Sequence, residues 1–496
     1  MNIYCMARPT TVVDTKEREF WRLIAEAAFS NPFSEQRLEL DLKIAGDFRD
    51  ESERVARLKK SICDRADRLE QQGVAHLRRY SGAEREVMRI GFLFEVFHRF
   101  CEEFDHLIVD QNRAGDASYR VQFASEALSL LARRGFAGEE ALRCFGIFYQ
   151  LRRAYYFIMH GLIGQSPCMR ELRRHSWNNV FTQDIRNYDR YLWNRMEDFS
   201  TLLLGETGTG KGTAAAAIGR SGFIPFDERK GCFAESFTRS FVALNLSQHP
   251  EALIESELFG HKKGAFTGAI EAHEGIFSRC SPHGAIFLDE IGEVSPPVQI
   301  KLLQILQERT FSPVGSHEKI RFRGRVIAAT NRPLDHLREK GLRDDFYYRL
   351  CSDVITVPPL CQRLRETPEE MDLLLDHLVS RTAGQPAPEL LEMVRRALAE
   401  TLDHAYAWPG NVRELEQAVR RILITRSYQG YENLPKKDLH HELTSGIANG
   451  SLDADALLSF YCTLLYQKHG TYEEVSRRTH LDRRTVKKYL RNGARA

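Results

Sequence analysis

The chain has 496 residues, of which 43% are hydrophobic and 28% are charged. This composition excludes an intrinsically disordered protein, and the length suggests about three globular domains. Lys and Arg (70) nearly balance Asp and Glu (68), and ten cysteines are scattered without paired spacing. The sequence contains neither an apolar leader nor a stretch long enough to span a bilayer, so we expect a cytoplasmic protein that binds no membrane.

Residues 1–158 are predicted to form an all-α regulatory or sensory domain of unknown type. Apolar residues recur at helical spacing from 87 to 106 and from 139 to 159, which is typical of a helical bundle. The segment lacks the acidic phosphoacceptor constellation of a receiver domain.

One group of side chains in this segment suggests an alternative role in metal binding. A solvated or ion-pairing helix face is favoured over a metal site, because no second helix with matching ligands is identifiable. The candidate ligands, expected on one helix with Glu-x-x-His spacing, are Glu95, His98, Cys101, Glu103 and His106.

A phosphate-binding loop is predicted between an apolar run at 201–204 and a helix-forming run at 213–218. Glycines let backbone N–H groups converge on phosphate oxygens, and Lys211 can reach the β- and γ-phosphates of ATP. Where such loops usually carry a Ser or Thr that binds Mg²⁺, this chain has Gly212, so the metal would rely on Thr213, Asp289 or water. The predicted ATP-binding residues here are Gly205, Glu206, Thr207, Gly208, Thr209, Gly210, Lys211, Gly212 and Thr213.

A short glycine-bracketed segment follows, and it is predicted to be an exposed loop tip. Phe266 and Thr267 are its only side chains larger than a methyl group, so the backbone can turn sharply and present both. An ordinary glycine turn is the alternative when the segment is taken alone. The loop residues are Gly264, Ala265, Phe266, Thr267, Gly268 and Ala269.

Two later apolar runs end in polar residues suited to ATP hydrolysis. Residues 284–288 form a buried-strand pattern that ends in Asp289, expected to organise Mg²⁺, and Glu290, expected to polarise the attacking water. Residues 325–329 deliver Thr330 and Asn331 at the end of a strand where parallel sheets place ligand-binding groups.

Arg343 and Arg349 lie six residues apart on a polar and aromatic segment. Each would be an ordinary surface arginine by composition alone. Together with a nucleotide site they suggest arginine fingers that neutralise charge on the γ-phosphate. If a neighbouring subunit supplies them, the active site is incomplete in a monomer.

A later helix is predicted to begin at Asn411 as N-cap, with Glu414 closing a capping box. Arg413 lies in the first turn, off the buried stripe, and is therefore available to a phosphate. The predicted buried stripe comprises Val412, Leu415, Val419, Ile422 and Leu423.

Residues 452–496 are predicted to form a helix-turn-helix that binds double-stranded DNA, after a linker at 431–451. Thr471 and Asp482 are suited to cap its second and third helices, and residues 471–496 hold eight Lys or Arg against three Asp or Glu. A solvated basic tail is the alternative, but tails lack this apolar spacing. The predicted DNA contacts are Arg483, Arg484, Thr485, Lys487 and Lys488.

The ordered motifs from Gly164 to about Arg426 resemble the central ATPase domain of sigma-54-dependent transcriptional activators, the bacterial enhancer-binding proteins of the AAA+ class. Residues 256–261 (Ser-Glu-Leu-Phe-Gly-His) leading into the 264–269 loop resemble a hallmark of that family, and residues 163–167 resemble its leading segment. The C-terminal unit is similar to the Fis-type helix-turn-helix that ends many of these activators.

The resemblance implies an α/β P-loop AAA+ core at 162–360, a parallel sheet with helices on both faces, and a helical lid at 361–430. It implies that the 264–269 loop contacts sigma-54, that Asn245 couples Glu290 to this loop, and that Arg413 is a second sensor. It also implies that Lys211, Asp289 and Glu290 bind and hydrolyse ATP, that Arg343 and Arg349 act across a subunit interface, and that the subunits form a ring, commonly a hexamer.

Three features depart from the family pattern. Gly212 replaces the Glu that usually follows the P-loop lysine, and residues 170–200 and 221–240 are longer than expected. The two long segments are predicted to be insertions at the rim of the core.

The sequence therefore predicts an ATP-dependent activator that binds an enhancer-like DNA site and remodels sigma-54 RNA polymerase holoenzyme. Two alternatives remain: a AAA+ remodelling enzyme that acts on another protein, and a DNA-binding repressor that uses nucleotide only to control assembly.

Overall fold

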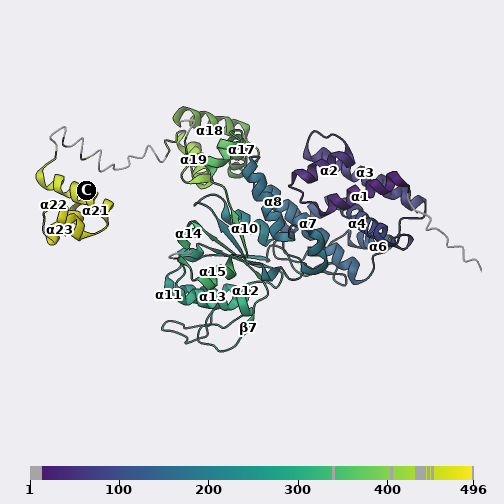
Figure 1. Ribbon diagram of the computed structural model, residues 1–496, viewed down its shortest axis with the longest axis horizontal. Helices are drawn as coiled ribbons and strands as arrows, with labels where there is room; N and C mark the ends of the chain where they lie inside the picture. Colours follow the sequence, from purple (N-terminus) through teal and green to yellow (C-terminus); the bar gives the residue numbers. More distant parts are fainter. Residues whose placement is uncertain are drawn as a thin grey trace, which may run out of the picture. The chain divides into compact units, whose positions relative to one another are not determined.

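The computed structural model describes residues 14–337, 341–402, 406–430 and 452–493, together with Leu443 and Ile447. One compact unit comprises the chain up to Ala387 with Gly410–Gln417, and the other comprises Pro388–Pro409 and the chain from Ala418 onward. Figure 1 shows their elements, and each unit is described by itself. In the described residues, no helix is both long and apolar enough to cross a membrane.

The N-terminal part of the first unit is a bundle of helices, which confirms the all-α prediction. Asp14, Ser34 and Asp50 each accept a hydrogen bond from the backbone three residues on and so begin the first three helices. The helices are α1 Thr15–Phe29, α2 Glu35–Ala45, α3 Glu51–Gln71, α4 Gly82–Arg99, α5 Cys101–Ala114, α6 Ala124–Arg134 and α7 Glu139–Gly161.

The expectation that the candidate metal ligands share one helix is wrong. The helix ends at Phe100, so Glu95 and His98 lie on α4 whereas Cys101 begins α5. Glu95 is fully buried and accepts two hydrogen bonds of 2.8 Å from the Arg134 guanidinium. An ion pair therefore occupies this carboxylate, and among the described residues no cluster of His, Cys, Asp or Glu could hold a metal ion.

The ATPase core contains a five-stranded parallel sheet in the order β4-β5-β8-β1-β9. Successive side chains along a strand point to opposite faces, and both faces are apolar. The strands are β1 Thr201–Leu204, β4 Phe241–Asn245, β5 Ala285–Asp289, β8 Arg325–Thr330 and β9 Asp353–Thr356.

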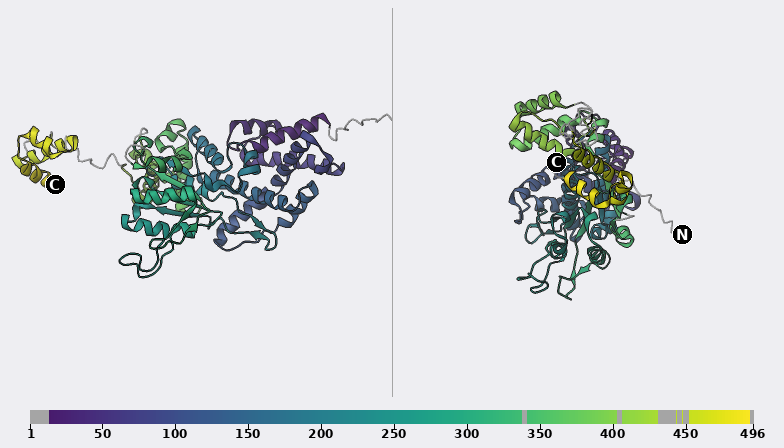
Figure 2. Two further views of the ribbon diagram at one scale, coloured as in Figure 1. Left: turned by 60° about the horizontal axis from the view of Figure 1, so that its bottom comes forward. Right: turned by 90° about the vertical axis from the view of Figure 1, so that its left-hand side faces the viewer.

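Helices cover both faces of this sheet, as predicted. Leu202 and Ile286 pack on one face with α11 Glu251–Phe259, α13 Pro296–Glu308 and α15 Asp344–Leu350. Leu203 and Phe287 pack on the other face with α7, α8 Pro167–Phe181 and the P-loop helix α10 Lys211–Gly219. Figure 1 shows α7 and α8 between α10 and the other helices of the bundle; Figure 2 gives two further views.

The two long segments do not lie at the rim. In the first segment, Trp177, Phe181 and Tyr188 are buried in the core beneath the sheet. In the second, the short hairpin of β2 Phe226–Asp227 and β3 Cys232–Phe233 enters the core of the N-terminal bundle.

Aromatic packing attaches this hairpin to α7. The rings of Tyr149 and Phe233 stack at 3.9 Å between centroids, and Phe145 and Phe226 meet edge to face at 5.0 Å. Val121 also donates its backbone N–H to Gly231 O at 2.9 Å. The bundle and the ATPase core therefore share buried apolar surface, whose removal from water stabilises their association.

Helix α7 also binds the end of α10. The fully buried Arg153 donates to the backbone carbonyls of Arg220 and Gly222, each at 2.7 Å, and Gln150 donates to Ser221 O at 2.9 Å. A guanidinium at a helix C-terminus satisfies carbonyls that lack a partner within the helix and matches the negative end of the helix dipole.

Two helices of the predicted lid, α16 Leu360–Glu366 and α17 Glu370–Ala383, belong to the first unit, as do the opening turns of α19 Asn411–Thr425. The second unit contains α18 Pro388–Thr401 and three C-terminal helices. Most of the predicted linker 431–451 lies outside the described residues.

The C-terminal helices are α21 Ala454–His469, α22 Tyr472–Thr479 and α23 Arg483–Gly493. They enclose a small core of Cys462, Val475, Val486 and Tyr489. The predicted caps are present: Thr471 accepts from Glu474 N, and Asp482 accepts from the backbone of Arg484 and Thr485. The short connections between the helices agree with a helix-turn-helix.

Candidate functional site

The loop from 205 to 210 joins β1 to α10. At two positions of this loop the backbone conformation favours glycine. Gly208 has φ +83° and Gly210 has φ +101°, a left-handed region that side chains disfavour. An added Cβ on Gly208 would lie 2.3 Å from Gly410 O. Close approach of two backbones therefore sets the shape of this loop.

Lys211 begins α10 and is only 7% exposed. Its Nζ donates to Gly205 O at 2.7 Å and to Glu206 O at 3.0 Å, so the ammonium group lies over the loop. Burial lowers the pKa of Lys211, and the nearby carboxylates of Glu290 and Asp289 oppose that shift. The negative charge of a phosphate would likewise favour the charged amine.

The two predicted carboxylates lie at the carboxyl end of β5. Glu290 has φ +58°, a strained conformation for a residue with a side chain, and its N–H donates to Asp289 Oδ1 at 3.1 Å. Asn245, at the end of the adjacent β4, has its Nδ2 3.5 Å from Asp289 Oδ2. In this structure Asn245 therefore contacts Asp289, whereas the family resemblance paired it with Glu290.

Of the two predicted residues at the carboxyl end of β8, Thr330 and Asn331, Asn331 contacts the phosphate loop. Its Nδ2 donates to Thr207 Oγ1 at 3.2 Å. Thr330 is fully buried, and its hydroxyl accepts from Arg332 N at 3.1 Å. Thr330 thus supports the turn that positions Asn331.

The predicted capping box at Asn411 takes a different form. Asn411 Nδ2 donates to Glu206 Oε2 at 3.0 Å and to Thr207 O at 3.2 Å, so its amide faces the phosphate loop. Glu414 accepts from Gly410 N at 2.7 Å and caps the helix in its place. Arg413 is exposed, as predicted, and its backbone N–H donates to Gly208 O at 3.3 Å.

Many of these groups line one cavity of about 640 Å³. Residues 207–211 of the phosphate loop, Asn245, Asp289, Glu290 and Arg413 line it, whereas Gly205, Glu206, Thr330, Asn331 and Asn411 do not. Its apolar side chains include Leu162, Ile163, Met169, Leu172, Val357 and Leu378, and the lid also contributes Arg363, His377 and Arg381. A cavity that joins a lysine-containing phosphate loop to apolar walls suits a nucleotide, whose phosphates are charged and whose base is largely apolar.

Arg343 and Arg349 do not line this cavity. Arg343 is exposed at the start of α15, and its guanidinium donates to both oxygens of Asp345 at 3.1 and 2.9 Å. Arg349 is exposed in the last turn of the same helix. Both arginines therefore lie outside the cavity of their own chain.

The 264–269 segment is an exposed tip, as predicted. Gly264 N donates to Ala269 O at 2.8 Å, and the positive φ angles of Gly264 (+79°) and Gly268 (+100°) allow the reversal. Phe266 is 38% exposed, with its ring 4.9 Å from that of His261. Figures 1 and 2 show this loop projecting beside the hairpin that carries β7 Ile320–Arg321.

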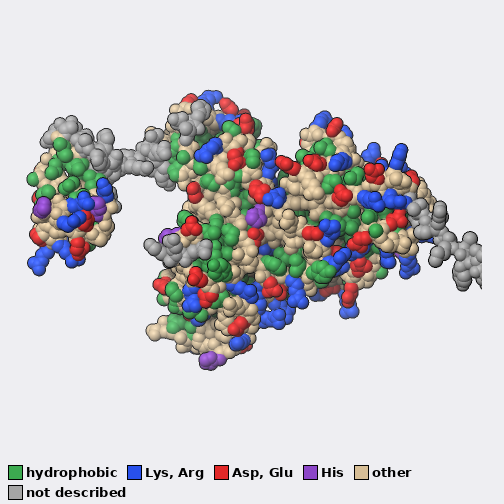
Figure 3. Space-filling view, viewed as in Figure 1, with side chains coloured by type: hydrophobic (Ala, Val, Ile, Leu, Met, Phe, Trp, Pro, Cys, Tyr) green, Lys and Arg blue, Asp and Glu red, His purple; other side chains and the backbone are tan. Residues whose placement is uncertain are grey.

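The predicted DNA-binding residues lie on the first turns of α23. Arg483, Arg484, Lys487 and Lys488 are exposed, whereas the Thr485 hydroxyl donates to Asp482 Oδ2 at 2.6 Å and so stabilises the helix start. Figure 3 shows Lys and Arg side chains along the lower edge of this small domain, with Asp and Glu side chains among them.

Comparison with known families agrees with this geometry. The model of the sigma-54 interaction domain matches residues 179–356, and the model of the AAA+ ATPase lid domain matches residues 365–452. The central part of the chain belongs to the sigma-54 interaction domain family.

Several curated proteins are similar to this region. The Nif-specific regulatory protein of Azotobacter vinelandii is 41% identical over 273 residues, which are 55% of this chain and 46% of that protein. The transcriptional regulator NtrC of Azospirillum brasilense is 38% identical over 269 residues, 54% of this chain and 49% of that protein. The chain thus spans about half the length of the curated relatives it matches. A crystal structure of NtrX from Brucella abortus in complex with ATP aligns at 19% identity with a TM-score of 0.41, over 75% of this chain and 80% of that chain.

The sequence did not predict the contacts of Glu370 near this site. The buried Glu370 of the AAA+ lid accepts hydrogen bonds from Gln165 N at 2.8 Å and Ser166 N at 2.7 Å, and it pairs with Arg363. Although burial raises the pKa of Glu370, the Arg363 charge and the Ser166 N–H outweigh it and hold the pKa below its usual value. No local pattern marks the contact of Glu370 with Gln165 and Ser166, because these partners lie 205 and 204 residues away in the sequence.

The close approach at Gly208 leads to a prediction about the nucleotide-binding loop of the sigma-54 interaction domain. Gly208→Ala combines a left-handed φ with a clash against Gly410 O, and we expect ATP affinity to fall by about tenfold or more. Titration with a fluorescent ATP analogue measures this. Gly212→Ala is the matched control, because its new Cβ would meet nothing closer than Phe287 Cε1 at 3.8 Å. Equal affinities for the two variants would contradict the importance of this approach.

Proposed function

We propose that this chain is an ATP-dependent activator of transcription. It binds DNA through its C-terminal helices, assembles into a ring, and uses ATP hydrolysis to remodel sigma-54 RNA polymerase so that the promoter opens. The observation that carries the proposal is the combination of a cavity that holds the phosphate loop and an exposed Phe266–Thr267 tip, in a chain whose residues 179–356 match the sigma-54 interaction domain.

In the proposed hydrolysis, the backbone N–H groups of the phosphate loop and the ammonium of Lys211 hold the β- and γ-phosphates. Glu290 orients a water molecule for attack on the γ-phosphorus and accepts its proton. Asp289 and the exposed Thr213 are the side chains suited to hold Mg²⁺. The metal would neutralise charge on the phosphate oxygens. Because Gly212 offers no side chain, water would complete the coordination of the Mg²⁺.

The exposed position of the arginines supports the proposed ring. A head-to-tail interface places one surface of a subunit against a different surface of the next. Arg343 and Arg349 are exposed on α15, outside the cavity of their own chain. We propose that they complete the cavity of the neighbouring subunit, which makes hydrolysis depend on assembly.

A mixing experiment tests both the chemistry and the interface. Purified Glu290→Gln should bind ATP without hydrolysing it, and Arg343→Ala should lose about 10³-fold or more in hydrolysis rate. When equal amounts are mixed, about one site in four combines an intact Glu290 with an intact neighbouring Arg343, so activity should return. A steady-state phosphate-release assay measures it.

A mixture as inactive as its components would contradict fingers in trans. Wild-type protein that binds ATP but never hydrolyses it would favour the alternative of a repressor in which nucleotide controls only assembly.

The loop provides the proposed contact with sigma-54. Its tip holds one aromatic and one hydroxyl side chain on a glycine-bounded turn, and its base is fixed by hydrogen bonds between the backbones of His261 and His273 at 3.0 Å. A stiff base with an exposed tip can transmit movement of the core to a partner.

Replacing Thr267 with Ala should separate hydrolysis from activation. The Thr267 side chain is exposed and remote from the ATP cavity, so ATP hydrolysis should be unchanged while transcription from a sigma-54 promoter is lost. The assay is in vitro transcription with purified holoenzyme. Thr310→Ala, in the adjacent hairpin, is the control and should activate normally.

Unchanged transcription by Thr267→Ala would contradict the proposed contact between the loop and sigma-54. A pull-down in the presence of a transition-state nucleotide analogue then distinguishes the remaining alternative, a AAA+ remodelling enzyme for another protein, because that enzyme would not retain sigma-54.

The proposed DNA contact predicts a change in salt dependence. Lys487 is exposed on α23, and if it binds a phosphate, Lys487→Ala should weaken binding to all sequences and reduce the salt slope by about 1 per bound domain. Fluorescence anisotropy at several salt concentrations measures the slope. Arg477→Ala is the control, because Arg477 pairs with Glu474 at 2.6 Å, and an identical slope for both variants would contradict the assignment.

A further inference from the structure

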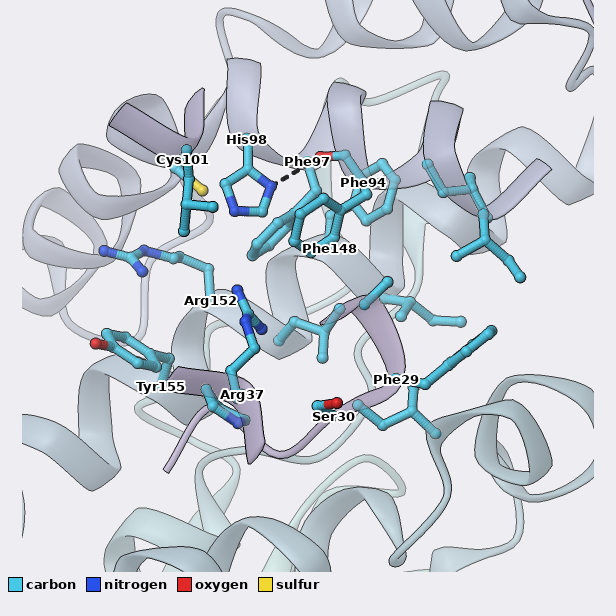
Figure 4. A pocket seen from close by; sticks show the side chains of 18 of the residues that line it. Phe29, Ser30, Arg37, Phe94, Phe97, His98, Cys101, Phe148, Arg152 and Tyr155 are labelled. Atoms are coloured by element: carbon cyan, nitrogen blue, oxygen red, sulfur yellow. Dashed lines mark hydrogen bonds between the residues drawn. The ribbon is translucent and has the colours of Figure 1, made fainter. Parts of the chain in front are cut away.

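The N-terminal bundle encloses a second cavity, of about 160 Å³, that the ATPase chemistry does not use. Side chains from α1, α2, α3, α4, α5 and α7 line it, together with Trp177 of α8 and Ile185. Figure 4 shows them around a common opening, with His98, Phe94, Phe97 and Phe148 on one side and Arg37, Ser30 and Phe29 on the other.

The size and lining of this cavity suit a single aromatic ring. Leu93, Phe94, Phe97, Ile147 and Phe148 supply apolar surface, and an apolar cavity of about 150 Å³ is large enough to bind benzene. Aromatic walls also favour edge-to-face contact with a ring.

The arginines that line the cavity already have carboxylate partners. Arg152 donates to both oxygens of Asp105 at 2.5 and 2.6 Å, and Arg37 donates to Asp41 at 2.7 Å. An anionic ligand would have to compete with these ion pairs, which costs free energy in a partly buried site. The charges present therefore favour an uncharged ligand.

His98 offers the ligand a hydrogen-bond acceptor. Its Nδ1 lies 2.8 Å from Phe94 O, and because a carbonyl oxygen can only accept, Nδ1 carries the proton. Burial lowers the pKa of His98 to about 3, so the ring stays neutral at physiological pH. Nε2 is then an acceptor in the wall of a cavity whose arginines are already paired with carboxylates.

We propose that this cavity binds a small uncharged aromatic molecule, of about one ring, that donates one N–H or O–H hydrogen bond to His98 Nε2.

Helix α7 connects this cavity to the nucleotide site. Ile147 and Phe148 line the cavity, whereas Gln150 and Arg153 hold the carbonyls after α10. A ligand that braces α7 therefore changes how firmly α10 is held, and so modulates ATP hydrolysis. This last step rests on the proposed ATPase, whereas binding itself does not.

The full-length protein is tested with toluene and aniline, which have nearly the same shape but differ in the N–H donor. Ligand-observed NMR and the shift in melting temperature report binding without reference to ATP. Aniline should bind about fivefold more tightly than toluene, the worth of one neutral hydrogen bond. Benzoate, which is anionic, should bind more weakly than either. Preference for benzoate, or no binding of toluene or aniline, would overturn the proposal.

Two variants locate the site. Ile147→Phe fills the cavity and should abolish binding of both probes, whereas Ile147→Val keeps the space and should retain it. Leu93→Phe fills the opposite wall and serves if Ile147→Phe does not fold. His98→Phe should remove the preference for aniline while toluene still binds. Binding that survives both filling variants, or a preference that survives His98→Phe, would place the ligand elsewhere.

Loss of binding in these assays refutes the cavity proposal even if ATP hydrolysis is normal. Binding without any effect on hydrolysis in an active protein refutes only the coupling through α7. Absence of hydrolysis in the wild type refutes the proposed ATPase and leaves the binding result standing.

Discussion

The position of helix α10 is the constraint on which the rest of the structure depends, because residues far away in the sequence hold both of its ends. At its N-terminus, the phosphate loop packs so closely on Gly410 that Gly208 has no room for a Cβ. At its C-terminus, Arg153 and Gln150 pair with carbonyls that would otherwise be buried without partners. The dipole of the helix agrees with both contacts, since its positive end faces the phosphate site and its negative end faces a guanidinium.

These contacts join the N-terminal bundle directly to the ATPase core. After α10 the chain forms the β2–β3 hairpin, in which Phe226 and Phe233 are buried among the aromatic residues of the bundle. The chain then continues into β4 of the sheet. The same segment therefore connects the phosphate loop, the bundle and the strand that ends in Asn245. A change in the packing of α7 reaches the nucleotide site through direct contacts, without a flexible linker.

The sequence predicted the features that depend on neighbours in the chain. A strand, a glycine loop and a helix are local, and so are the polar residues at the ends of β5 and β8 and the caps at Thr471 and Asp482. Contacts between distant segments were not predicted: Glu370 with the leading segment, Asn411 with the phosphate loop, and the hairpin within the bundle. The single helix expected for Glu95 to His106 was wrong for a related reason, because helical spacing was extended through Phe100, where one helix ends and the next begins.

Helices with different proposed roles pack on the two faces of the sheet. Helix α15, which carries the exposed arginines, packs on one face, whereas α7, α8 and α10 pack on the other. In the proposed ring, the bundle therefore acts on the nucleotide site of its own chain, whereas the arginines at α15 act on the site of the neighbouring subunit. Since α10 carries Lys211 and begins at the phosphate loop, we propose that the bundle acts on how the phosphates are held. The arginines of the neighbouring subunit would act on the charge that develops as the phosphates are cleaved. Two inputs that meet at one γ-phosphate need no further relay between them.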